Sequence, residues 1–175
     1  MSSSPLAFFI TFSTYGAWLH GRDVGSIDKS HNKVGTPFLP PDEGRERLES
    51  SNLREAPYLL DDDRRSVVLQ TILEVARHRR WKIWACHVRT THVHVVVSAD
   101  AKPEKVMSDF KAYASRRLKE RLNENAVAKR WTQHGSTRYL WKEEDVAAKV
   151  EYVLNGQGNP MAVYDGRNDE SEPEA

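Results

Sequence analysis

Residues 91–98 read Thr91-His92-Val93-His94-Val95-Val96-Val97-Ser98, and this stretch decides how the chain folds. It is rich in β-branched residues and begins by alternating polar and apolar side chains, which predicts a β-strand. Successive side chains of a strand point to opposite faces, so His92 and His94 stand on one face and Val93 on the other. Two neutral imidazoles this close can bind a metal ion, although the spacing also fits two polar residues on a solvated face.

Length and composition indicate a single globular domain. The 175 residues are 39% hydrophobic and 29% charged, which is enough apolar material for one core. No apolar run is long enough to span a bilayer, and the N-terminus lacks the charged and apolar regions of a signal peptide. The one cysteine, Cys86, cannot form an internal disulfide, so we expect a cytoplasmic protein without a membrane segment.

The net charge of +1 does not by itself indicate nucleic-acid binding, but the charges are unevenly distributed. Basic residues crowd segments 77–82 and 102–121, while acidic residues gather at 61–63 and 165–172. A nearly neutral total can therefore hide a basic face, and the local face is what a phosphate backbone meets.

Hydrophobic periodicity and turn residues predict the order of the elements. We expect strands at 7–14, 81–88 and 91–98, helices at 61–80, 105–125 and 142–155, and a short β-hairpin at 130–141 with its turn near 134–135. Gly and Pro recur in residues 22–57 and predict a long loop. Residues 1–166 are thus expected to form one domain, followed by a disordered acidic tail at 167–175.

This order of elements predicts an α+β fold. Two strands joined by a short connection, with helices before and after them, are typical of a ferredoxin-like sandwich. We expect an antiparallel sheet with helices on one face and with the other face, which carries the two histidines, free.

Several chemistries that use a His-x-His pair do not fit. A histidine-triad hydrolase would need a third histidine at the position of Val96, and a single cysteine excludes a cysteine-rich zinc site. The pattern that remains is a strand with His92-Val93-His94, then a helix, a β-hairpin and a last helix with Tyr152. Over residues 7–160 this pattern resembles the HUH single-tyrosine transposases, the small transposases of minimal insertion sequences and their REP-associated relatives.

The resemblance implies a function. It implies a metal-dependent transposase and endonuclease acting on single-stranded DNA with hairpin ends, in which Tyr152 attacks a phosphate and forms a 5′-phosphotyrosine. His92 and His94 would hold Mg²⁺ or Mn²⁺. It also implies a homodimer, for which the apolar Val95-Val96-Val97 stretch is a candidate strand for pairing across a two-fold axis, since an unpaired apolar edge is a hazard.

The family's third metal ligand lies four residues after the tyrosine, where this chain has Gly156. We expect Gln157 to complete the site in preference to Asn155, because Gln157 can turn back if the helix ends at Gly156. The glycine also leaves open a second hypothesis, a domesticated protein of the same fold that binds DNA hairpins without catalysis. A third is an unrelated α+β domain in which the histidine pair is incidental.

Other residues are further candidates for a functional role. Tyr139 is a rival nucleophile, although it is expected in a β-hairpin instead of a helix, and His87 and His134 are other candidates for the site. The basic face of the 105–125 helix is by itself typical of a solvated surface. With DNA as the expected partner, three of its residues become candidate DNA contacts, namely Lys111, Arg116 and Lys119.

Overall fold

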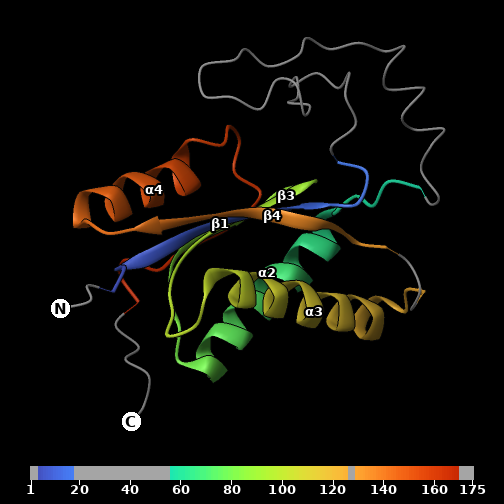
Figure 1. Ribbon diagram of the computed structural model, residues 1–175. Helices are drawn as coiled ribbons and strands as arrows, with labels where there is room; N and C mark the ends of the chain where they lie inside the picture. Colours follow the sequence, from blue (N-terminus) through green and yellow to red (C-terminus); the bar gives the residue numbers. More distant parts are fainter. Residues whose placement is uncertain (1–3, 18–55, 126–128, 170–175) are drawn as a thin grey trace, which may run out of the picture.

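The computed structural model describes residues 4–17, 56–125 and 129–169, which form an α+β sandwich (Figure 1). Its elements are β1 (Ala7–Thr14), α2 (Asp62–Arg79), β2 (Lys82–Val88), β3 (His92–Ser98), α3 (Pro103–Leu122), β4 (Trp131–Leu140), α4 (Glu143–Asn155) and β5 (Ala162–Asp165). The strands pair antiparallel in the order β4-β1-β3-β2-β5. The predicted α+β class and antiparallel sheet are therefore confirmed.

The helices lie on both faces of the sheet (Figure 1), which corrects one detail of the expected sandwich. Helices α2 and α3 cover the face that carries Phe8, Ile10 and Phe12 of β1, and this is the larger core. Helix α4 covers part of the other face, where its apolar side chains pack on Phe9 and Val96. The face that carries the histidines is thus partly covered by α4, because α4 has an apolar stripe that must be buried.

Strand β3 is the central strand of the sheet, with β1 on one side and β2 on the other. Its residues Val93, Val95, Val96 and Val97 are completely buried, as expected for a strand covered on both faces. The prediction that Val95-Val96-Val97 pairs across a two-fold axis is therefore wrong, because both edges of β3 are already hydrogen-bonded. In the described ranges the edge strands are β4 and β5.

Two elements near the C-terminus differ from the expectation. Residues 131–140 form one continuous strand instead of a β-hairpin, because Gly135 does not turn the chain and lies opposite Phe12 in the pairing with β1. A side chain at Gly135 would meet the Met107 sulfur at 2.5 Å, so glycine here permits close packing. Strand β5 was not predicted; its four residues pair with β2 and extend the sheet.

The predicted division into one domain with a long loop and an acidic tail stays a prediction. Residues 18–55 of the expected loop and residues 170–175 of the expected tail lie outside the described ranges. At the start of the tail, the Arg167 guanidinium donates to the Asp165 carboxylate at 2.6 Å.

None of the described helices is long and apolar enough to cross a membrane.

Candidate active site

The two histidines of β3 stand on one face of the sheet, as the alternation of the strand predicts. Their ring centroids are 6.2 Å apart and the ring planes differ by only 6°. This is the face that α4 partly covers, and His94 is 9% exposed while His92, nearer the strand end, is less buried. The rings are therefore parallel neighbours with access to solvent at the edge of the helix.

Hydroxyl groups hold both rings in place. The Nδ1 atom of His94 lies 3.1 Å from the Thr11 hydroxyl of β1, and Nδ1 of His92 lies 2.8 Å from the Thr91 hydroxyl. When each Nδ1 carries the proton and donates it to the hydroxyl oxygen, the Nε2 lone pair remains available for a cation.

The histidine rings are held in the neutral form. Burial first, and then electrostatic repulsion from the neighbouring His92, His87 and Arg89, together lower the pKa of His94 to about 4. Burial, and then the Arg89 guanidinium, also lower the pKa of His92. Both rings are thus unprotonated at neutral pH, which is the state in which an imidazole binds a metal ion.

Helix α4 brings Tyr152 to the histidines. Its residues Val150 and Val153 are buried against the sheet, which fixes the direction in which the last turn of the helix faces. The Tyr152 ring meets the His94 ring edge-on at a centroid distance of 6.3 Å, and meets the Phe9 ring at 6.0 Å. Tyr152 is 43% exposed, so a large substrate can reach its hydroxyl.

Lys149 is a further charged residue at this site, and it belongs to none of the motifs that predicted the site. Its ammonium lies 5.4 Å from the centre of the Tyr152 ring and 5.2 Å from that of Phe9. The sequence could have indicated this, because Lys149 lies three residues before Tyr152 on the predicted helix and residues three apart on a helix are neighbours on its surface. With Arg89 close to the histidines, the site has positive charge on two sides.

Gly156 leaves no side chain at the position of the family's third ligand. A Cβ atom there would lie 2.8 Å from the Tyr152 carbonyl oxygen and 3.0 Å from its ring carbon Cδ2. The Asn155 amide donates to Glu151 at 2.7 Å on the exposed side of α4. The Gln157 amide nitrogen lies 3.4 Å from the Tyr152 carbonyl, so this side chain folds back towards the tyrosine. That Gln157, in preference to Asn155, completes the site stays a prediction.

The described side chains that could bind a divalent cation at this site are two imidazoles and one amide, without a carboxylate. Among the described residues, no group of three or more His, Cys, Asp or Glu side chains could hold a metal ion. Two neutral imidazoles and one amide oxygen nevertheless fit an ion such as Mg²⁺ or Mn²⁺ that keeps water ligands and takes phosphate oxygens from its substrate. His92, His94 and Gln157 are the residues that would hold it.

The other predicted candidates differ in where they lie. Tyr139 packs edge-on against Phe8, whose side chain points to the α2 and α3 face, so it lies across the sheet from the histidines. His134 is exposed on β4. His87 is completely buried and pairs with His94 across β2 and β3.

The three candidate DNA contacts lie on α3, across the sheet from Tyr152 (Figure 1). The Lys111 ammonium donates to the backbone carbonyls of Thr132 and His134 at 2.9 and 3.3 Å, which ties α3 to β4. Arg116 lies over the ring of Tyr113, and Lys119 is exposed. Their contact with DNA stays a prediction.

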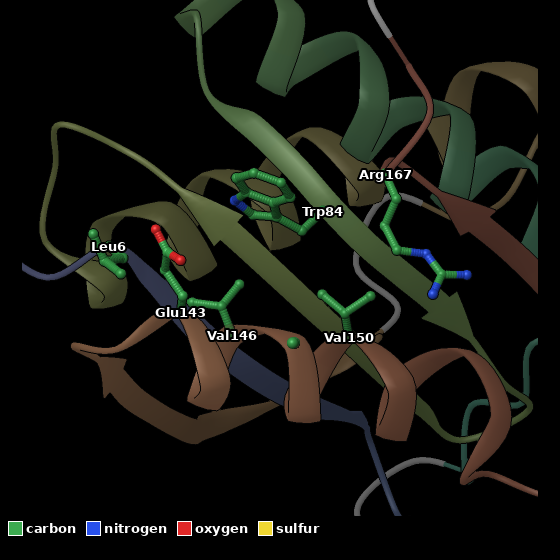
Figure 2. Close-up of a pocket in the computed structure, with 7 residues that line it drawn as sticks. Leu6, Trp84, Glu143, Val146, Val150 and Arg167 are labelled. Carbon is green, nitrogen blue, oxygen red and sulfur yellow. The ribbon is translucent and has the colours of Figure 1, made fainter.

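A groove of about 430 Å³ runs between the first half of α4 and β2 (Figure 2). Val146 and Val150 of the helix and Trp84 of the strand form its apolar wall, and Glu143 and Arg167 also line it. None of the predicted site residues lines this groove. The site chemistry is therefore at the other end of the helix.

The fold and the site together define a small α+β protein in which a helix tyrosine faces a pair of strand histidines. The sequence profile of the family described as "Transposase IS200 like" matches residues 54–153, which is more than half of the chain and includes His92, His94 and Tyr152. The chain belongs to this family of IS200-like transposases.

Solved structures with a similar fold include two transposase-related proteins. One is a REP-associated tyrosine transposase bound to a REP hairpin, at 12% identity and a TM-score of 0.47, covering 89% of this chain and 69% of that one. The other, from Deinococcus radiodurans R1, is described as a candidate transposase, at 12% identity and a TM-score of 0.48, covering 88% and 92%. A comparison with curated proteins gave no match. The family assignment rests on the sequence match.

Proposed function

We propose that this protein is a metal-dependent single-stranded DNA transposase and endonuclease that cleaves and rejoins DNA through a 5′-phosphotyrosine. One observation carries the proposal: Tyr152 lies 6.3 Å, ring centre to ring centre, from His94, in a site with two neutral imidazoles and flanking cations. A nucleophile beside a metal-binding pair is the constellation that phosphate chemistry needs.

The chain's own residues perform the positioning and the attack. Lys149 and Arg89 place positive charge around Tyr152 and the histidines, which attracts a DNA phosphate to the site. The Tyr152 oxygen forms a bond to phosphorus, and the bond from phosphorus to the 3′ oxygen breaks. The phenol gives its proton to water, and the leaving 3′ oxygen takes a proton from water. A bound Mg²⁺ or Mn²⁺ would polarise the phosphate and stabilise the charge that develops on it.

The same bond change run in reverse explains rejoining. A free 3′ hydroxyl attacks the phosphotyrosine and releases Tyr152, so the energy of the phosphodiester bond is kept and no ATP is required. The partner implied by the resemblance is single-stranded DNA with hairpin ends, bound by a homodimer. Lys and Arg contacts with phosphates would supply most of the affinity.

A direct test is to incubate the full chain with 3′-end-labelled single-stranded DNA from its own genomic flanks, with Mg²⁺ or Mn²⁺. Cleavage through tyrosine leaves the 5′-phosphorylated side of the DNA covalently attached, so the label migrates with the denatured protein. The expected result is an adduct that requires a metal ion and a hairpin-bearing strand. Metal-independent cleavage, or hydrolysis without an adduct, would contradict the mechanism.

Gly156 favours a second candidate function, a DNA-hairpin-binding protein without catalysis. The position that carries the family's third ligand has no side chain, and Tyr152 packs against it. This alternative predicts tight binding of hairpin DNA but no adduct with any metal ion or flanking strand. The adduct assay combined with a binding measurement on the same DNA therefore separates the two functions.

A further inference from the structure

His87 is a completely buried histidine to which the proposed reaction assigns no role. It lies on β2 opposite His94, so its side chain is on the sheet face beneath α4. A buried polar side chain needs hydrogen-bond partners. Two partners of His87 come from the C-terminal end of the chain, and the Arg89 guanidinium also lies 3.5 Å from its Nε2.

The hydrogen bonds of His87 define its tautomer. The backbone N–H of Met161 donates to Nε2 at 3.1 Å, so Nε2 must be unprotonated. Nδ1 therefore carries the proton and donates it to the Val153 carbonyl, also at 3.1 Å. Only the neutral ring with its proton on Nδ1 satisfies both partners.

These two bonds hold the segment that carries Tyr152. Val153 follows Tyr152 in the last turn of α4, where carbonyl groups have no partner within the helix. His87 supplies that partner from the sheet. It also binds Met161, which leads into β5, so one side chain fixes both ends of the connection after α4.

We infer that His87 is a positioning residue that docks the last turn of α4 on the sheet and thereby sets Tyr152 beside His94. The inference rests on the proposed function for its catalytic consequence, whereas the docking itself can be measured without DNA. An error of about 1 Å in placing a reacting group can cost about 10²-fold in rate, so a single bond at the helix end is enough to matter.

The test compares His87→Ala and His87→Gln with Cys86→Ala in the full chain. Cys86 is the residue before His87 on the same strand and is equally buried, but it faces the α2 and α3 core, so it controls for loosening of β2. Hydrogen–deuterium exchange of peptides covering residues 150–161 reports the docking. Adduct formation at saturating labelled DNA reports the catalytic consequence.

The expected result for His87→Ala is faster exchange at 150–161 and a fall of about 10²-fold in the rate of adduct formation, with DNA affinity unchanged. The Mn²⁺ concentration for half-maximal rate should also stay unchanged, because His87 is not a metal ligand. His87→Gln, whose amide can both donate and accept, should recover part of the rate, and Cys86→Ala should change neither readout.

Each other outcome decides against the inference. Unchanged exchange in His87→Ala, or equal changes in Cys86→Ala, would show that His87 does not dock the helix. Faster exchange with an unchanged adduct rate would show that the docking does not position Tyr152. If the wild-type protein forms no adduct, the proposed function fails, and the exchange result alone decides whether His87 holds α4.

Discussion

The Tyr152 ring meets the His94 imidazole edge-on, with the ring centroids 6.3 Å apart and the planes at 80°. The tyrosine comes from the last turn of α4 and the histidine from the central strand of the sheet. Their contact exists because α4 packs its apolar stripe on the histidine face. The site is therefore a product of helix docking, and substitutions on either side of the contact test it.

Tyr152→Phe should abolish the covalent DNA adduct and leave DNA binding nearly unchanged. The substitution removes only the hydroxyl, whereas phosphate contacts supply most of the affinity. Denaturing gels of labelled DNA measure the adduct, and fluorescence anisotropy measures binding. Tyr139→Phe is the matched control, because Tyr139 is equally exposed but lies across the sheet. An adduct that survives in Tyr152→Phe and disappears in Tyr139→Phe would reverse the assignment.

His92→Ala and His94→Ala should each abolish adduct formation under conditions where the wild-type protein is active with Mg²⁺. Each substitution removes one of the two imidazoles that would hold the metal ion. Excess Mn²⁺ should restore part of the activity, because a weakened site can be filled at a higher ion concentration, while Tyr152→Phe should not respond. A Mn²⁺ titration of all three variants checks the difference; equal rescue of Tyr152→Phe would argue against separate roles.

Lys149→Ala should slow adduct formation by about 10-fold to 10²-fold, as expected for loss of a charge that stabilises a transition state. Lys149→Arg should keep much of the rate, since the positive charge remains beside Tyr152. Single-turnover rates at low and high salt are the measurement. Lys142→Ala at the other end of α4 is the control, and a rate equal to that of Lys149→Ala would show a general charge effect.

Gly156→Ala should destabilise the protein by about 1–3 kcal/mol, because the added Cβ would crowd the Tyr152 carbonyl at 2.8 Å. The relief of this clash should move Tyr152 and reduce adduct formation. Gly158→Ala is the control: it also costs stability, about 1–2 kcal/mol, because φ is +76°, but nothing lies within 4 Å of the new atom. Urea unfolding and adduct assays on both variants should show similar losses of stability but different losses of activity.

Glu124 should make stability depend on acid pH. Burial acts to raise the pKa of Glu124, but hydrogen bonds from Tyr58, Arg64 and Arg130 outweigh it and hold the pKa below its usual value. The folded pKa is thus below the unfolded value of about 4.3, so this stabilisation is present above that pH and is lost as pH falls through the folded pKa.

Glu124→Gln should therefore cost about 1.5–3 kcal/mol at pH 7, in line with hydrogen bonds to a charged group. The difference from wild type should shrink as the pH is lowered below about 4. Urea unfolding of both proteins across this range measures it. A difference that stays constant with pH would mean that the charge of Glu124 contributes nothing to stability.

Local patterns in the sequence determined most of the elements. The alternation at residues 91–98 placed His92 and His94 on one face, because side chains of a strand alternate whatever it pairs with. Helix α2 was predicted almost to its ends, since Asp61 accepts the Arg64 backbone N–H at its N-terminus and basic residues close its last turn. These features depend on residues close together in the chain.

Only the tertiary structure decided how the elements meet. β3 became the central strand because β1 and β2 pair with its two edges, and β4 became one strand instead of a β-hairpin because it pairs along its length with β1. The side of the sheet on which α4 packs follows from which face has apolar surface left to cover, and this choice brings Tyr152 to His94 and Lys149 to Phe9. Such contacts join residues distant in the chain, so no local pattern could specify them, and long-range burial fixed them instead.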